Sequence, residues 1–490
     1  MSARPSIDHL TGCRFLASLW IVCNHFVPRG PTSLLEASLS RSNVAVSFFI
    51  TMSGFITHWA YSDRVLDGDR ASVARRNQYY VRRLGRVLTT TWVAMILGLV
   101  VMMIWEPGSV GNPSHVVRCF CFIETWFHPQ DWCPNGQTWT IAALLPSWLL
   151  YPWSKKIVAG VESRFGGSGL VLSMLLLWVL EFGSIMGVFL AQGFYLTADQ
   201  HYQTYTWPAS QLVDFLIGCF AAALAKQHLK AFQQRLGDQA AGTRVPENAA
   251  LAVELSDNAP VGQRDAPSPR HVLLAYSSCG VAADHGFISV VALCFLVPSG
   301  AYRQGYEPLY NHGLVPAFVL FLWGGAVQAT TDNHTATGPF QPQRRRCYSS
   351  IAVRCLRHPI LLALGACSFE VFLFQWPVHF VVTSLLGDSG SASSEVFVLF
   401  LLVLWSFSAW YIAVVEAPLV KWLRKSSEHW GAPEVETRVP CEEASSLIAI
   451  SGQRSHCHRD AVPLPTAAYG TRHIETPEPK FSSASVADCM

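Results

Sequence analysis

The chain has 490 residues, of which 51% are hydrophobic and only 14% are charged, whereas about 25% of the residues in an average soluble domain are charged. This shortage of charge, together with 17 Trp and 28 Phe, excludes an ordinary soluble domain and predicts that most of the chain lies in lipid. The net charge of +2 does not indicate nucleic-acid binding, because the basic residues cluster between apolar runs and do not cover one face.

The first apolar segment, within residues 12–30, is expected to remain in the protein as a membrane anchor. It ends in Pro28-Arg29-Gly30, which is not the small-residue site of a cleavable signal peptide. Further runs of about 20 mostly apolar residues predict an all-α membrane protein with about ten transmembrane helices. The predicted spans are residues 13–29, 42–61, 87–105, 138–153, 168–190, 208–225, 272–296, 313–329, 359–386 and 394–415.

The distribution of Lys and Arg between alternate loops predicts that both termini are cytoplasmic. Basic residues beside a span resist translocation, so the loops that hold them stay inside. Only Arg29, Arg41, Arg118 and Arg303 fall in the outer loops. The inner loops hold Arg64, Arg70, Arg75, Arg76, Arg82, Arg83, Arg86, Lys155, Lys156, Arg164, Arg344 to Arg346, Arg354, Arg357, Lys421, Arg424 and Lys425.

Two polar regions are expected to be disordered and cytoplasmic. Residues 226–270 and 426–490 are rich in Ala, Gln, Pro, Ser and charged residues, with little apolar periodicity. The chain then consists of a transmembrane domain over residues 1–425, with an insert at 226–270, and a tail over 426–490. The sequon that begins at Asn333 would face the cytoplasm and stay unglycosylated.

The 14 cysteines have no metal-ligand spacing, so no metal site is predicted. Only Cys119, Cys121 and Cys133, between two spans, are placed for a bridge, and unpaired thiols fit the sequence equally well. Polar residues of the outer loops could bind an acceptor or be plain solvated surface. They include His115, His128, Asp131, His201 and Tyr202.

The first span contains two groups that are costly in hydrocarbon, Arg14 and His25. Eleven residues of helix advance about 16 Å and turn about 1,100°, or three turns and roughly 20°, so both residues lie on one stripe. Arg14 alone is also typical of a topology anchor. His25 alone could be a structural hydrogen-bonding residue, with Asn24 as part of the same contact.

The run "LTGCRFLASLWIVCNHF" over residues 10–26 resembles the first-span signature of the membrane-bound acyltransferase family 3. This family includes bacterial sugar O-acetyltransferases and related eukaryotic proteins. Later stretches resemble its other motifs in the same order, from about residue 8 to 425. They are "VAVSFFITMSGFI" (44–56), "YVRRLGRVL" (80–88), "WTIAALLPSWLLYP" (139–152), "CSFEVFLFQWPV" (367–378) and "VVEAPLVKWLRK" (414–425).

Three positions depart from the family pattern. Leu144 stands where the family usually has Glu, and Gln375 where it usually has His before Trp-Pro. Thr89 or Thr90 replaces the proline that often follows the basic segment. The chain therefore has fewer candidate proton carriers than the family pattern has. An enzyme that has lost its activity remains an alternative interpretation.

The resemblance implies acyl transfer from acyl-coenzyme A, with acetyl the expected group, to a hydroxyl of a carbohydrate or lipid-linked acceptor. Such a reaction needs a general base or a nucleophile that accepts the acyl group, and His25 is the candidate for either role. The phosphates of coenzyme A suit bidentate arginine. Arg14, Arg83 and Arg86 are therefore the predicted donor-binding residues, although Arg83 and Arg86 also fit topology anchors.

Other polar residues of the spans have weaker assignments. Ser53, beside Gly54, could bond in the cavity, but packing of a small pair is the favoured interpretation. Glu370 and Gln375 are separated by about 140° around their helix, so at most one faces the cavity of His25. Glu416 is expected to pair with a loop arginine and stabilise the fold.

The leading hypothesis is thus a multi-pass acyltransferase of the plasma membrane or an endomembrane. A catalytically silent membrane scaffold of the same family remains an alternative, favoured by Leu144 and Gln375. A proton-coupled transporter that uses His25 as a relay is a third, although the sequence lacks a convincing internal repeat.

Overall fold

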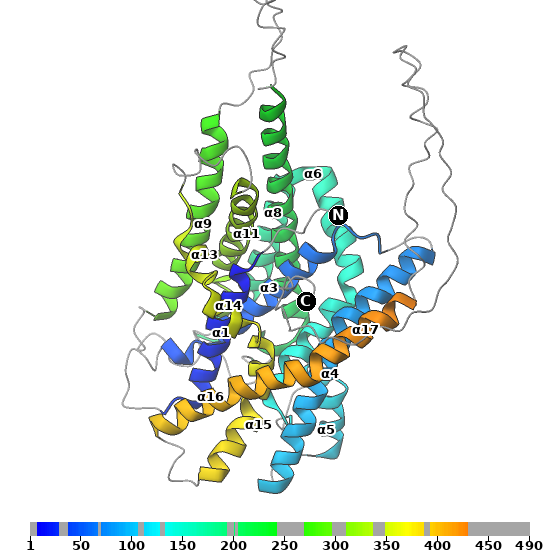
Figure 1. Ribbon diagram of the computed structural model, residues 1–490, viewed down its shortest axis with the longest axis vertical. Coiled ribbons are helices and arrows are strands. Elements are labelled where there is room, and N and C mark those ends of the chain that lie inside the picture. Colours follow the sequence, from blue (N-terminus) through cyan, green and yellow to red (C-terminus); the bar gives the residue numbers. More distant parts are fainter. Residues whose placement is uncertain are drawn as a thin grey trace, which may run out of the picture.

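The computed structural model describes most of the chain as helix. Within the described residues no strand occurs, as the all-α prediction requires. Figure 1 shows the helices as one elongated bundle, with α8 and α9 extending toward one end and α4, α15 and α16 toward the other. The described residues are 7–28, 38–66, 70–105, 112–127, 133–193, 200, 204–242, 269–295, 310–336, 348–386 and 393–429.

The principal elements follow the predicted apolar runs. The first half contains α1 (His9–Phe26), α3 (Asn43–Tyr61), α4 (Arg70–Trp105), α5 (Pro113–Phe120), the short 3₁₀ turns η2 (Glu124–Trp126) and η3 (Gly136–Thr138), and α6 (Trp139–Ala191). The second half contains α8 (Pro208–Gly242), α9 (Pro269–Phe295), α11 (Val315–Ala336), α13 (Ile351–Leu356), α14 (Pro359–Gly365), α15 (Ser368–Leu386), α16 (Ser394–Tyr411), the π-helical turn η7 (Ile412–Glu416) and α17 (Ala417–His429).

Seven helices of the described residues are long and apolar enough to cross a membrane. Large apolar side chains such as Leu176, Leu180 and Leu402 are exposed on their outer faces, as expected where lipid replaces water. The protein is therefore an integral membrane protein. These helices cover Ser38–Tyr61, Ser72–Trp105, Gly136–Ala191, Pro208–Gln234, Ser277–Phe295, Ser368–Leu386 and Ser394–Ser427, and Val315–Thr331 is a shorter apolar helix.

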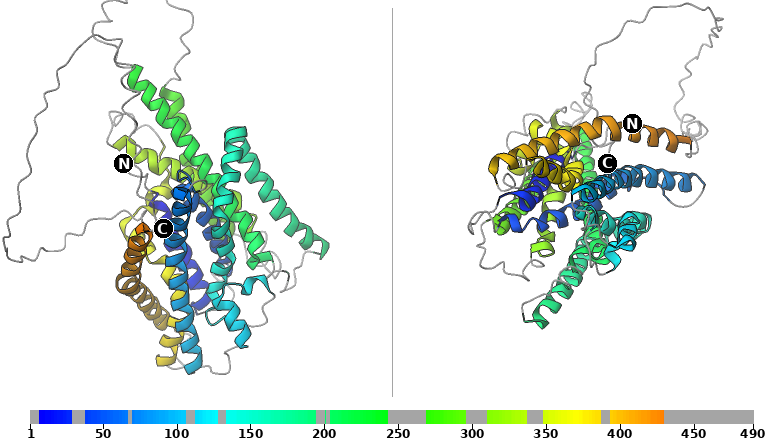
Figure 2. Two further views of the ribbon diagram at one scale, coloured as in Figure 1. Left: turned by 90° about the vertical axis from the view of Figure 1, so that its right-hand side faces the viewer. Right: turned by 90° about the horizontal axis from the view of Figure 1, so that it is seen from below.

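The predicted fourth and fifth spans form one element, α6, which changes direction at Gly166. Gly166 has φ of 62° and ψ of −151°, a conformation that side chains with a Cβ rarely adopt. The left view of Figure 2 shows the two halves diverging, with the second half at the edge of the molecule. A single glycine thus separates two spans that the sequence predicted to be joined by a loop.

The predicted ninth span, residues 359–386, is not one helix. The chain forms α14 and then α15, with a turn at Ala366 and Cys367 between them. α14 packs against α1, and α15 packs against α1, α4 and α16. The break lets this region contact the first span along two separate helices.

Parts of the two regions that were expected to be disordered are helical. α8 continues to Gly242 and α9 begins at Pro269, so both ends of the 226–270 insert are helical, and residues 243–268 lie outside the described residues. α17 continues to His429, which makes the start of the 426–490 tail helical too, and residues 430–490 lie outside the described residues. Lys226 explains part of the extension, because its ammonium group lies 2.6 Å from Asp63 after α3.

Candidate active site

A cavity of about 150 Å³ lies between α1, α3, α4, α6 and α15. Four arginines line it, namely Arg14 from α1 and Arg82, Arg83 and Arg86 from α4. The rest of the wall is mostly apolar and includes Phe49, Ile50, Ile141, Leu144, Phe369 and Phe372. The structure thus brings the three predicted donor-binding arginines together in one space, and Leu144 forms part of the apolar wall.

Ser53 fixes the position of Arg83. Its hydroxyl oxygen accepts hydrogen bonds from Nη2 of Arg83 and from Nε1 of Trp148, both at 2.9 Å. The guanidinium of Arg83 also lies 5.0 Å from the centre of the Trp148 ring, a favourable cation–π distance. Ser53 therefore lines the cavity and forms hydrogen bonds there, in addition to standing in the closely packed pair with Gly54.

Gly54 provides the close helix contact that was expected of the Ser53–Gly54 pair. A Cβ on Gly54 would lie 1.9 Å from the carbonyl oxygen of Phe215 in α8, so any side chain there would push α3 and α8 apart. Because Ser53 is the neighbouring residue of α3, this contact also constrains where Ser53 meets Arg83 and Trp148.

Arg86 bridges two acidic side chains. Its Nη2 lies 3.3 Å from Oε1 of Glu370 in α15, and its Nε lies 2.7 Å from Oε1 of Glu416 in η7. Both carboxylates are almost fully buried, so the positive charge of Arg86 offsets part of a negative charge that would be costly alone. The predicted pairing of Glu416 with an arginine is confirmed, and Arg86 has a structural role in addition to its place on the cavity wall.

Gln375 contacts His25 directly. Its Oε1 lies 3.0 Å from Nδ1 of His25, and its Nε2 donates to the carbonyl of Phe372 at 2.8 Å. Because a backbone carbonyl can only accept, the second bond fixes which end of the amide faces His25. The imidazole then carries its proton on Nδ1, and Nε2 keeps the lone pair that a general base needs.

His25 does not line the cavity, and its side chain is exposed among the described residues rather than enclosed. Gln137 connects the two places. Its Nε2 lies 3.5 Å from Nδ1 of His25, and its carbonyl accepts the hydroxyl of Thr140, which lines the cavity. Gln137 therefore links His25 to a residue of the cavity wall. The two contacts of Nδ1 require different protonation of that atom, because Oε1 of Gln375 can only accept and Nε2 of Gln137 can only donate. The shorter contact, at 3.0 Å to Gln375, is the hydrogen bond.

The turn that carries Gln137 is fastened from two sides. Asn135 donates through Nδ2 to the carbonyl of Leu373 in α15 at 2.7 Å, and its Oδ1 accepts from the backbone of Gln137. On the other side, Cys133 forms a disulfide with Cys119 in α5. The prediction of a bridge among the three outer cysteines is confirmed for this pair, whereas Cys121 is free and exposed.

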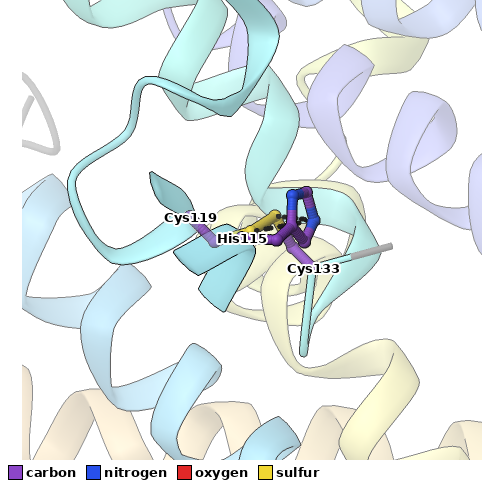
Figure 3. A group of neighbouring side chains, drawn as sticks. All are labelled: His115, Cys119 and Cys133. Carbon is purple, nitrogen blue, oxygen red and sulfur yellow. Dashed lines mark hydrogen bonds between the residues drawn. A yellow bond between two sulfur atoms is a disulfide. The ribbon is translucent and has the colours of Figure 1, made fainter. Parts of the chain in front are cut away.

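His115 lies beside this disulfide, as Figure 3 shows, with its Nε2 3.5 Å from the sulfur of Cys119. Its side chain is 2% exposed, so His115 is packed inside the protein and is not solvated surface. The other predicted acceptor-binding residues of the outer loops, His128, Asp131, His201 and Tyr202, lie outside the described residues.

The sequence did not single out Gln137, Trp148 or Thr140. Trp148 and Thr140 lie within the motif at residues 139–152, but no periodicity distinguishes a cavity-lining tryptophan from a lipid-facing one. Gln137 precedes the motif in a polar turn. Its contact with His25 depends on how the outer loop folds back, which local sequence does not specify.

Comparison with known families gives one match. A family described as an acyltransferase domain matches residues 7–415, which covers every residue of the cavity and His25. Searches among curated proteins and among solved structures found no match.

Proposed function

Because the chain belongs to this acyltransferase family, we propose that it is an integral-membrane enzyme that transfers an acyl group, preferably acetyl, from acyl-coenzyme A to a hydroxyl. The proposed acceptor is a carbohydrate or a lipid-linked molecule. The observation that carries the proposal is the cavity itself, which has Arg14, Arg82, Arg83 and Arg86 on its wall and is linked to His25 through Thr140 and Gln137.

We propose that ten spans cross the membrane with both termini on the cytoplasmic side. The described helices support this count if α6 is taken as two spans and α1 and α11 are added to the long apolar helices. The clustering of basic residues in alternate loops supports the orientation. The arginines of α4 then lie toward the cytoplasm, where acyl-coenzyme A is made available, and η3 lies toward the outside.

The size of the cavity limits which part of acyl-coenzyme A could enter it. At about 150 Å³ it is smaller than the roughly 300–1,000 Å³ of pockets that enclose a drug-sized ligand. The nucleotide would therefore remain at the arginine-lined inner end, where guanidinium groups suit phosphates. Only the thin thioester arm would follow the apolar wall past Leu144 toward Thr140 and His25.

In the proposed reaction, Nε2 of His25 takes the proton of the acceptor hydroxyl, and the hydroxyl oxygen attacks the thioester carbonyl. The tetrahedral intermediate collapses with cleavage of the carbon–sulfur bond, and the imidazolium returns the proton to the leaving thiolate. Gln375 supports this role by accepting the Nδ1 proton. The exposure of His25 supports access of an acceptor from the side opposite the cavity.

The test is release of free coenzyme A from acetyl-coenzyme A by the purified full chain, with and without candidate acceptors. We expect His25→Ala to lower the rate by at least about 100-fold, the lower range for loss of a general base, while the protein is still inserted and stable. His285→Ala, at an exposed histidine of α9, is the matched control. If the native protein releases no more free coenzyme A than His25→Ala with any acceptor, the scaffold alternative replaces the enzyme.

A further inference from the structure

Three ionisable side chains meet away from the cavity, in the membrane part of the bundle. Nδ1 of His312, just before α11, lies 3.0 Å from Oε1 of Glu181 in α6 and 3.8 Å from Oδ2 of Asp214 in α8. One potential ligand atom from each residue lies within 4.8 Å of the others. All three side chains are at most 6% exposed.

Glu181 occupies a position where packing alone would favour an apolar residue. The second half of α6 buries one stripe, which contains Leu170, Met174, Ile185 and Phe189, and Glu181 stands in the middle of it. The other faces of this half expose large apolar side chains. A carboxylate in such a stripe is costly unless a partner of opposite charge neutralises it.

The charges of the three residues do not balance when both carboxylates are ionised. The two carboxylates then carry two negative charges, and a protonated His312 offsets only one of them. Among the described residues, no Lys or Arg forms an ion pair with Glu181 or Asp214. A divalent cation in place of the histidine proton would neutralise both carboxylates at once.

The donor set and spacing fit a transition-metal ion. Around zinc, with bonds of roughly 2.0–2.2 Å in a tetrahedron, neighbouring ligand atoms lie roughly 3.3–3.6 Å apart, between the two distances observed here. Two carboxylate oxygens and one imidazole nitrogen suit zinc better than calcium or magnesium, which prefer oxygen alone. The carbonyl of His312 accepts Nε1 of Trp178 at 2.9 Å, so the segment that carries the imidazole is held in place.

We propose that Glu181, Asp214 and His312 bind one divalent transition-metal ion, with zinc the best match, and that this ion fastens the second half of α6 to α8 and to the start of α11. The three residues come from segments far apart in the sequence, which explains why no ligand spacing predicted a metal site. The ion's role is structural, since the group is separate from the arginine-lined cavity.

Metal binding to the purified full chain tests this inference without any activity assay. After dialysis against a chelator, and without reductant so that the Cys119–Cys133 disulfide persists, Zn²⁺ is added and metal content and Tm are measured. We expect about one zinc per chain and a rise in Tm of several degrees, since a ligand that binds only the folded state stabilises it. Mg²⁺ and Ca²⁺ at the same concentration should leave Tm unchanged.

The variants Glu181→Gln and Asp214→Asn should bind Zn²⁺ at least about tenfold more weakly and lose the rise in Tm. His58→Gln, at another buried histidine of the bundle, should behave like the native protein. If Zn²⁺ leaves the Tm of the native chain unchanged, or if Mg²⁺ and Ca²⁺ raise it equally, the proposal is overturned. The native titration decides the question even where a variant fails to fold.

Discussion

The side-chain oxygen of Gln375 lies 3.0 Å from Nδ1 of His25, while the nitrogen of the same amide donates to the carbonyl of Phe372. The Gln375 amide accepts a hydrogen bond from Nδ1–H of His25 and so fixes the tautomer of this imidazole. A histidine at position 375 could do the same. The amide cannot carry a proton itself, so the proposed reaction depends on His25 as its single proton carrier.

Removal of the Gln375 oxygen should slow the reaction without preventing assembly. Gln375→Leu loses one hydrogen bond of about 0.5–1.5 kcal/mol, so we expect the rate of thiol release to fall roughly 2- to 13-fold. Gln375→His, which can still accept at one ring nitrogen, should keep more activity than the leucine variant. Equal loss in both variants would show that the tautomer of His25 does not limit the rate.

Arg83→Ala should weaken donor binding more than it slows chemistry. A hydrogen bond to a charged group contributes about 1.5–3 kcal/mol, so KM for acetyl-coenzyme A should rise roughly 10- to 150-fold. Ser53→Ala, which keeps the guanidinium but removes its anchor, should have a smaller effect. Arg164→Ala, at an exposed position of α6, is the control, and an equal rise in KM there would contradict a specific phosphate contact.

Arg86→Ala should instead destabilise the protein. It would leave Glu370 and Glu416 buried without their counter-charge, and breaking a buried pair from one side costs about 3–5 kcal/mol. We expect a fall in Tm of several degrees. The triple variant with Glu370→Gln and Glu416→Gln should recover part of it, whereas a Tm for Arg86→Ala equal to that of the native chain would show that the bridge contributes nothing.

Reduction of the Cys119–Cys133 disulfide should lower activity through the turn at residues 133–138. The bridge holds the start of this turn, and its other end carries Gln137 against His25. A Cys119→Ser and Cys133→Ser double variant should lose activity several-fold and become insensitive to reductant. Cys121→Ser, at a free exposed cysteine, should remain as active and as sensitive to reductant as the native protein.

The segment between α4 and α6 should also give stability a pH dependence. Burial raises the pKa of Glu124, which is 3% exposed, from 4.5 to about 8. The folded protein then binds a proton that the unfolded chain has released, so stability falls as pH rises from about 4.5 to 8 and changes no further above that. Glu124→Gln should remove this contribution to the slope of Tm against pH. Glu162→Gln, the control, should have the same slope as the native protein. A native slope unchanged by Glu124→Gln would contradict the assignment.

The proposed orientation can be checked with the sequon at Asn333, near the end of α11. In eukaryotic cells this residue should stay unmodified, because it would face the cytoplasm. A sequon placed in the outer segment 106–111 should be glycosylated and shift the mass of the protein. Glycosylation of Asn333 would reverse the assigned direction of α11.

The sequence by itself determined that this is a membrane protein, where most of its apolar helices lie, and that Arg14, Arg83 and Arg86 are candidate donor-binding residues. Apolar runs and clusters of basic residues are local properties of a sequence. The sequence also placed Arg14 and His25 in the first helix. It could not reveal that α6 turns at Gly166, that α14 and α15 are separate, or that the helices flanking the insert continue into it.

Only the tertiary structure decided which polar groups meet. Arg83 contacts Ser53 and Trp148, Arg86 joins Glu370 and Glu416, and Gln375 bonds to His25, each across helices remote in sequence. Glu181, Asp214 and His312 converge in the same way. Such contacts depend on the rotation and depth of whole helices, and these are set by the packing of many apolar side chains at once. The sequence therefore determined the candidates, and the fold decided their partners.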